Sequence, residues 1–405
     1  MAMALTAPVA VGLRSSPSQA DRAAAIPVPS TRARVSAEGS PQGVVYTFGV
    51  VDSFGALMTL VHSTPTAVAG IHGTVIQIAA SNSNGYALTS DGRVWAWGAG
   101  GQGELGNGTT PRLTAKAVAV QFPPGVKIAS LANPMPFDTG IAIDTQGDAW
   151  GWGANTEHAL CLRGTGPILF PEKLPLNDVR LASGARSHSL FLAHGRVVAC
   201  GDNAAGDLGN GTLTPRAAPT AVVGLPRGQV VALVSSWQGS GALFADGRYF
   251  DWGFNLEGQL GDGTTRHSSI PVQVRLPAPV ERVFQGGSQP SNGQTLALLA
   301  DGSLWAWGDG KWGQLGDGRY VSSSRPVKVL VPRGVRFTDV ATGGYASYAI
   351  SSAGVLWSWG SNRLGQLGDG QAELLTARPR STGLMASQVV STDVNVVAYG
   401  ISGTA

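Results

Sequence analysis

A two-residue anchor, Trp-Gly or a close relative, recurs along the chain at intervals of 48 to 55 residues. Its copies are Phe48-Gly49, Trp97-Gly98, Trp152-Gly153, Cys200-Gly201, Trp252-Gly253, Trp307-Gly308 and Trp359-Gly360. A repeat of this length is typical of architectures in which each unit buries its apolar surface against the next unit. The anchor therefore constrains the fold more than any other feature of the sequence.

Each anchor lies in the same local context, which predicts four short strands per repeat. A turn precedes it, and the copies of that turn are Asp91-Gly92, Gln146-Gly147, His194-Gly195, Asp246-Gly247, Asp301-Gly302 and Ala353-Gly354. Apolar residues flank this turn on both sides, and Asp-Gly in that setting favours a type I′ hairpin. A second cassette, such as Gly258-Gln259-Leu260-Gly261, follows the anchor and leads into a strand that contains proline. After Trp152 we align the weakened cassette as Ala159-Leu160-Cys161-Leu162, with Cys161 in the place of leucine.

Glycine and tryptophan are abundant, with 57 and 11 copies, while only 13% of the residues are charged. This composition excludes a coiled coil or a long-helix bundle, and 43% hydrophobic residues argue against disorder. One four-stranded sheet cannot bury both of its faces, whereas sheets stacked around an axis can. The sequence predicts an all-β fold, a seven-bladed β-propeller of four-stranded blades.

The two ends of the chain complement each other. The residues after Gly360 contain a cassette and an apolar strand near Val396 but no anchor, and Gly43–Gly49 contain the missing strand and anchor. We therefore expect the N-terminal strand to close the last blade. The predicted organisation is an Ala/Pro/Ser-rich tail over residues 1–40, which is disordered or resembles a leader, followed by the propeller over residues 41–405.

Cys161 and Cys200 are the two cysteines of the chain, too few for a disulfide framework or a cysteine-rich zinc site. One disulfide and two buried thiols both fit the sequence, and we expect two buried thiols between blades.

Charge and motifs exclude several classes of function. The net charge is +3 without a run of basic residues, so no nucleic-acid partner is expected. No apolar run is long enough for a membrane helix. The six histidines show no metal-ligand spacing, and we expect neither a metal, a cofactor nor a catalytic site.

Two other patterns are explained by the repeat. Gly98–Gly103 and Gly308–Gly313 match G-x-G-x-x-G, but a turn and a strand are expected after them instead of the helix that a dinucleotide site needs. Asn107-Gly108-Thr109 and Asn210-Gly211-Thr212 match a glycosylation sequon, yet sister copies carry Asp-Gly there. We interpret this position as a turn.

The Gly-Gln-Leu-Gly loop, the apolar strand, the Asp-Gly turn and the Trp-Gly strand end together resemble the regulator of chromosome condensation repeat family over about residues 43–405. The resemblance implies a seven-bladed propeller. It also implies functions that differ widely among members: nucleotide exchange on the small GTPase Ran, ultraviolet sensing in plants, secreted inhibition of β-lactamases, and protein scaffolding. The photoreceptor's repeated Gly-Trp-Arg-His-Thr is absent here, so ultraviolet sensing is not expected.

The turns that enter the apolar strands are expected to project to one face of the ring, and here the copies diverge. Phe137, Arg186, Trp237 and Tyr345 occupy these turns and belong to residue types that dominate protein interfaces. They are the candidate partner-binding residues. The alternative is that Trp237 or Phe137 simply fills the top of a blade.

The sequence thus favours a non-enzymatic protein-interaction scaffold, monomeric, with a protein partner. The alternatives are a guanine-nucleotide exchange factor for a small GTPase and a secreted enzyme inhibitor. A cytoplasmic location is slightly favoured, and an extracellular one applies if the N-terminal tail is a remnant signal.

Overall fold

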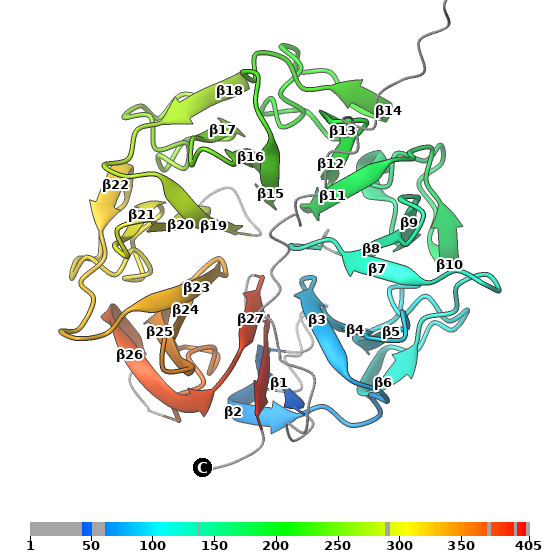
Figure 1. Cartoon of the computed structure of the whole chain (residues 1–405), viewed down its shortest axis with the longest axis horizontal. Helices are drawn as coiled ribbons and strands as arrows, with labels where there is room; N and C mark the ends of the chain where they lie inside the picture. The colour runs from blue at the N-terminus through cyan, green and yellow to red at the C-terminus, as the bar shows by residue number, and fades with distance from the viewer. Residues whose placement is uncertain are drawn as a thin grey trace, which may run out of the picture. The chain divides into compact units, whose positions relative to one another are not determined.

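Seven antiparallel sheets of four strands each are arranged as blades around a central axis in the computed structural model (Figure 1). The structure describes residues 43–50, 61–135, 138–287, 292–370, 374–392 and 395–401. The tail predicted over residues 1–40 lies outside them. No helix of the described residues is long and apolar enough to cross a membrane.

We number the blades along the chain and give the strands of each from the axis outward. Blade 1 comprises β3 (Val75–Ala80), β4 (Asn84–Thr89), β5 (Val94–Ala99) and β6 (Leu113–Ala119). Blade 2 comprises β7 (Ile128–Leu131), β8 (Thr139–Asp144), β9 (Ala149–Gly153) and β10 (Ile168–Lys173), with a 3₁₀ turn η2 (Thr156–His158) between the last two. Blade 3 comprises β11 (Val179–Gly184), β12 (His188–Ala193), β13 (Arg196–Gly201) and β14 (Arg216–Ala221).

The remaining blades follow the same order. Blade 4 comprises β15 (Val230–Ser236), β16 (Gly239–Phe244), β17 (Tyr249–Gly253) and β18 (Ser268–Val274). Blade 5 comprises β19 (Val280–Gly286), β20 (Gln294–Leu299), β21 (Leu304–Gly308) and β22 (Ser323–Lys328). Blade 6 comprises β23 (Phe337–Thr342), β24 (Ala346–Ser351), β25 (Val355–Ser361) and β26 (Leu375–Met385). Blade 7 comprises β27 (Gln388–Ser391), β28 (Asn395–Ile401), β1 (Gly43–Val50) and β2 (Val61–Ala67).

The predicted closure is confirmed. β1 pairs with β28 in continuous antiparallel register from Gly43 opposite Ile401 to Gly49 opposite Asn395. The N-terminal part of the chain supplies two strands of blade 7, β1 and β2, and the C-terminal part supplies the other two. Both ends of the propeller are therefore held in one sheet.

Burial follows the position of a strand within its blade. The second strands β4, β12 and β20 are buried along their whole length, because neighbouring blades cover both of their faces. The outermost strand β14 is largely half-buried or exposed. Prolines lie in outermost strands, for example Pro271 in β18, where a missing N–H does not interrupt the sheet.

The anchor tryptophans lie between adjacent blades, as predicted, and form one recurring joint. The indole Nε1–H of Trp152 donates to the Glu104 carbonyl of the preceding blade at 2.8 Å, and Trp252 and Trp359 bond in the same way to Asp207 and Gln314 at 2.9 Å. The last glycine of each Gly-x-Leu-Gly cassette packs against the ring of the next blade. These pairs are Gly106 with Trp152, Gly209 with Trp252, Gly261 with Trp307, Gly316 with Trp359 and Gly368 with Phe48.

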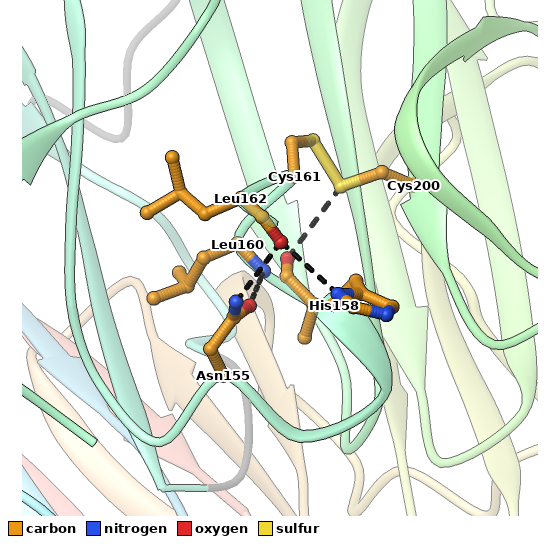
Figure 2. Close-up of a disulfide and its surroundings, with 7 residues drawn as sticks. Asn155, His158, Leu160, Cys161, Leu162 and Cys200 are labelled. Carbon is orange, nitrogen blue, oxygen red and sulfur yellow. Dashed lines mark hydrogen bonds between the residues drawn. A yellow bond between two sulfur atoms is a disulfide. The ribbon is translucent and has the colours of Figure 1, made fainter. Parts of the chain in front are cut away.

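Blades 2 and 3 are joined differently, by a disulfide between Cys161 and Cys200 (Figure 2). The expectation of two buried thiols was wrong, although both residues are buried between blades as predicted. The register of the cassette was also wrong. The Leu160 N–H donates to the Asn155 side chain as Leu208 does to Asn203, so Leu160 is the leucine of the cassette. Cys161 occupies the last glycine position, and its φ of 56° is the counterpart of 60° at Gly209.

The joint between blades 2 and 3 is thus a paired replacement. Cys161 stands where other blades have the glycine, and Cys200 stands where the next blade has the tryptophan. The Cys200 Sγ lies 3.7 Å from the Ala159 carbonyl oxygen, the atom that corresponds to the acceptor of the indole N–H in other blades. At this joint a disulfide bond therefore replaces the packing of a tryptophan ring against a glycine.

Two turn predictions had different outcomes. Among the described hairpins only His194-Gly195 has both residues at positive φ, 49° and 70°, which a type I′ turn requires. At Asp91-Gly92 only the glycine does, so the type I′ prediction was wrong there. The sequon positions are turns as predicted: Asn107 Oδ1 accepts from the Thr109 N–H at 3.1 Å, and Asp262 does the same for Thr264 at 2.8 Å.

The glycine of the Trp-Gly anchor lies close to the backbone of the inner turn, and this contact gives a stability prediction. Gly360 has a φ of 111°, and a Cβ there would lie 2.4 Å from the Tyr345 carbonyl oxygen. We expect G360A to lower the free energy of unfolding by about 3 kcal/mol or more, because strained backbone and a clash combine. Gly101 is the control, because a Cβ added there would meet no atom within 4 Å, and G101A should change little. Denaturant unfolding measures both, and equal effects would contradict this role.

A second prediction concerns the disulfide. Unreduced, denatured protein should carry no alkylatable thiol by mass spectrometry and should carry both after reduction. C161A/C200A should lose about 2–4 kcal/mol of unfolding free energy, the usual range for a disulfide. C161G/C200W should lose less, because it rebuilds the joint of the other blades. Two thiols in the unreduced protein would refute the pairing.

Candidate functional site

The turns that enter the second strands and the long loops that leave the third strands emerge at the same end of every blade, because successive strands are antiparallel. We call this end the loop face. In each of blades 1 to 6 the residue after the anchor glycine donates its N–H to a carbonyl of the inner turn, and the pairs are Ala99 to Ser83, Ala154 to Asp138, Asp202 to Ser187, Phe254 to Gln238, Asp309 to Gly293 and Ser361 to Tyr345. The two kinds of loop are therefore held together.

Three of the four candidate partner-binding residues lie on described parts of the loop face. Arg186 is exposed, and Trp237 and Tyr345 are half-buried. Phe137 lies outside the described residues. The structure brings Arg186 and Trp237 together, with the guanidinium carbon 5.6 Å from the centre of the ring. Tyr345 belongs to a different group, because its ring packs edge-on against Trp312, with 5.9 Å between ring centres.

Sequence reasoning missed the aromatic and basic residues of the outer loops. Arg363 lies over the Trp312 ring at 4.3 Å, so blades 5 and 6 meet in a cation–π contact. Phe254 lies 6.4 Å from Trp237 and stacks on His267. A signal was available for Arg363, which stands where blades 1 to 3 carry the small or polar residues Gly101, Thr156 and Ala204.

The same sector carries exposed apolar side chains. Over blades 3 to 6 the exposed large apolar residues of the outer loops are Leu213, Leu256, Tyr320, Val321 and Leu374. The described outer loops of blades 1 and 2 contain no exposed residue of this kind. Blades 4 and 5 are also linked by an ion pair of Lys311 with Glu257, which in turn accepts from the Ser322 hydroxyl at 2.9 Å. Among the described residues, the exposed large apolar side chains of the outer loops therefore lie over blades 3 to 6.

A small hollow that is open to solvent lies near the axis. Residues from the inner ends of several blades line it, and they include Asn82, Arg186, Ser236, Trp237, Gln285 and Thr392. Inner turns of several blades, among them those that hold Asn82, Arg186, Trp237 and Thr392, contribute to it. The Arg186–Trp237 pair forms part of the wall, so the hollow belongs to the candidate site.

A buried polar network supports the hollow from blades 4 and 5. Gln285 donates through Nε2 to Tyr249 Oη at 3.0 Å and to Asp251 Oδ1 at 2.8 Å. Asp251 is 1% exposed, and burial raises the pKa of its carboxyl well above the ordinary value. A neutral carboxylic acid at this position avoids the cost of a buried charge.

Two further carboxyl groups lie beneath the loop face in blades 1 and 2. Burial, and then the nearby charge of Glu104, raise the pKa of Asp138 to about 7, while Arg186 opposes this rise. Glu104 is itself buried, and burial raises its pKa. The carboxyl of Asp138 is therefore a weak counter-ion for Arg186 near neutral pH.

His188 is structural in this arrangement. Its Nε2 lies 2.8 Å from the Ser240 hydroxyl, which donates to the Asp207 carbonyl and so connects blades 3 and 4. Burial lowers the pKa of His188 to about 4, so the ring is neutral at physiological pH. Among the described residues no group of three or more His, Cys, Asp or Glu side chains is placed to hold a metal ion.

Comparison with known proteins agrees with this architecture. The family model "Regulator of chromosome condensation (RCC1) repeat" matches residues 91–133, 246–289 and 301–350, and a second family model of the same description matches residues 75–104. The RCC1 domain-containing protein RUG3, mitochondrial, of Arabidopsis thaliana is 30% identical over 306 residues, which cover 68% of this chain and 67% of the relative. The chain belongs to the regulator of chromosome condensation repeat family.

A further relative and a solved structure are also similar to this chain. The ultraviolet-B receptor UVR8 of Arabidopsis thaliana is 27% identical over 316 residues, covering 76% of this chain and 70% of the receptor. Prp20p of Saccharomyces cerevisiae, whose structure was solved with a study of its binding to Gsp1p and histones, superposes with a TM-score of 0.74. It is 22% identical, and the match covers 91% of this chain and 93% of Prp20p. This similarity shows a shared fold.

The buried carboxyl of Asp251 gives a prediction on pH. Its folded pKa is raised, so the folded state binds more protons than the unfolded state at neutral pH, and stability falls as pH rises above the ordinary pKa. D251N removes this dependence and keeps a group of similar shape. We expect D251N to match the wild type near pH 4 and to exceed it in melting temperature at pH 8.

The control is the exposed Asp246, whose pKa is lowered by hydrogen bonds from the Arg248 backbone and side chain. D246N should therefore lose a little stability above the ordinary pKa instead of gaining it. Thermal unfolding across this pH range tests both variants. A difference between D251N and wild type that stays constant with pH would contradict the neutral-carboxyl assignment.

Proposed function

We propose that this RCC1 propeller is a non-enzymatic, monomeric protein-interaction module that binds a protein partner on the loop face over blades 3 to 6. The observation that carries the proposal is the clustering of Arg186 with Trp237, and of Trp312 with Tyr345 and Arg363, at positions where the repeat framework is interrupted. Trp, Tyr and Arg dominate the binding energy of protein interfaces.

The exposed apolar residues of the same sector support the proposal. Leu256, Tyr320 and Val321 are 60%, 49% and 56% exposed. Exposed apolar groups beside half-buried aromatic residues are a common feature of interaction surfaces. The binding properties named for Prp20p, toward Gsp1p and histones, also favour a protein as partner.

Two alternatives to a scaffold also involve a protein partner. In a nucleotide-exchange factor the bound protein would be a small GTPase, and in a secreted inhibitor it would be an enzyme. The buried disulfide supports folding in an oxidising compartment, because such bonds persist where thiols are not kept reduced. It therefore favours the extracellular location over the cytoplasmic one.

The test is affinity purification from the native host with matched variants. We expect W237A/Y345A to lose partners that the wild type captures, because both aromatic side chains would leave the binding surface. F170A is the control, since Phe170 is an exposed aromatic residue on the outermost strand of blade 2, at the outer edge of the ring. Circular dichroism and melting temperature establish that each variant is folded.

The same captured proteins with W237A/Y345A as with wild type would refute the proposed face. A nucleotide-release assay on small GTPases separates the exchange-factor case from a scaffold, because only an exchange factor accelerates release.

A further inference from the structure

The second residue of the Gly-x-Leu-Gly cassette is buried in blades 1, 3, 4, 5 and 6, but its chemistry varies. In that order the residues are Glu104, Asp207, Gln259, Gln314 and Gln366. In each of them one side-chain oxygen accepts the N–H of the residue two positions earlier. This bond measures 2.7 Å from Gln102 to Glu104 and 2.8 Å from Trp312 to Gln314. The glutamate of blade 1 thus makes the contact that an amide oxygen makes in blade 5.

The other polar atom of this side chain distinguishes glutamate from glutamine. Gln314 donates through Nε2 to Asp309 Oδ2 at 2.9 Å. Glu104 is 0% exposed, and its Oε1 has no hydrogen-bond partner among the described residues. An ionised carboxylate only accepts hydrogen bonds, so Glu104 can take the donor role of the glutamine only when it carries a proton. Burial favours that neutral form, because it raises the pKa of Glu104.

The repeat places Asp138 of blade 2 against this glutamate. In blade 5 the inner-turn position of Asp138 is held by Gly293, since each accepts the N–H of the residue after the anchor glycine. A Cβ added to Gly293 would lie 3.0 Å from Cγ and 3.4 Å from Nε2 of Gln259, the cassette residue of the preceding blade. By this equivalence the side chain of Asp138 lies against that of Glu104, the cassette residue that precedes it.

Asp138 also has an unsatisfied oxygen. Its Oδ1 is buried and has no hydrogen-bond partner in the part of the chain that the structure describes. One proton, carried by one carboxyl and accepted by the other, satisfies both groups. Two other side chains act on the pair. Burial, and then the charges of Glu104 and Asp138, raise the pKa of Tyr86 in β4, and Arg186 in the inner turn of blade 3 opposes the rise in the pKa of Asp138.

The residues that carry this pair also hold blades 1 and 2 together. The Glu104 carbonyl accepts from Tyr86 Oη at 3.1 Å and from Trp152 Nε1 at 2.8 Å. The Asp138 carbonyl accepts from the Ala154 N–H at 2.8 Å. A second negative charge at this buried position is costly, because like charges repel and neither carboxylate can then donate. Ionisation of both groups therefore acts directly on the joint.

We propose that Glu104 and Asp138 share one proton across the joint between blades 1 and 2, and that loss of this proton as pH rises loosens the joint. The pair is a pH-sensitive device within the fold, and it does not depend on which partner binds. Because both folded pKa values are raised, the stabilisation is fully present below the ordinary pKa of a carboxyl and is lost as pH rises through about 7, the value for Asp138.

The first test is a reciprocal exchange of acid and amide, followed by thermal unfolding from pH 4 to pH 8. E104Q keeps a donor for Asp138 at every pH. We expect it to match the wild type in melting temperature near pH 4 and to exceed it by about 1–3 °C at pH 8. Q314E places an acid beside Asp309 in blade 5. It should match the wild type near pH 4 and fall below it at pH 8.

The second test measures local opening in the wild type by hydrogen exchange with mass spectrometry. After correction for the intrinsic exchange rate, the amides of Gln102 and Ala154 should open about tenfold more at pH 8 than at pH 6. The amides of Asp309 and Trp312 are the internal control, because they hold the corresponding positions beside a glutamine. In E104Q the pH dependence at Gln102 and Ala154 should disappear.

Two outcomes overturn the inference. A difference in melting temperature between E104Q and wild type that stays constant with pH would show that Glu104 does not carry the proton. Equal opening of the blade 5 amides between pH 6 and pH 8 would show a general loosening of the propeller. Circular dichroism at pH 6 establishes that both variants are folded, and the exchange measurement on the wild type tests the joint even if Q314E does not fold.

Discussion

The rest of the propeller depends on the joint between neighbouring blades, where an aromatic ring lies against a glycine. The ring can approach because the glycine has no side chain and adopts positive φ, as at Gly316 against Trp359. The indole N–H then bonds to a carbonyl of the same loop. The contact thus buries a large apolar surface, and at Trp152, Trp252 and Trp359 it also satisfies a buried donor. In blade 2 the glycine is replaced by Cys161 and in blade 3 the ring is replaced by Cys200, and a disulfide joins the two.

Much of the fold is predictable because the anchor ring packs against a cassette glycine in five of the repeats. The spacing of the Trp-Gly pairs indicates the number of blades, and the missing anchor after Gly360 indicates how the ring closes. The errors in the disulfide and in the cassette register arose where a repeat had diverged, whereas the type I′ prediction failed at Asp91-Gly92, a regular copy of the turn. In blade 2 the cassette register depended on Asn155, whose side chain bonds to Leu160, a contact that the spacing of the glycines does not reveal.

The candidate site was predictable only in part. Divergence at the inner turns identified Arg186 and Trp237, and the structure shows that they touch. Trp312 and Arg363 diverge as well, but they lie in the outer loops, and the sequence does not show that these loops reach the same face beside Tyr345. Which residues face one another depends on the rotation between blades. Repeat alignment therefore finds candidate positions, whereas contacts across blades need the three-dimensional structure.

The pairing of β1 with β28 has a consequence for synthesis of the chain. Gly43 of β1 lies opposite Ile401 of β28. Strand β1 is therefore synthesised long before β28, and it cannot pair with β28 until almost the whole propeller has left the ribosome. The entropy of closing so long a loop rises only slowly with its length, so the final ring is stable despite the separation. During elongation, however, an unpaired edge of β1 is available to other chains. Nascent chains of this protein are therefore most vulnerable to aggregation until the last blade is complete.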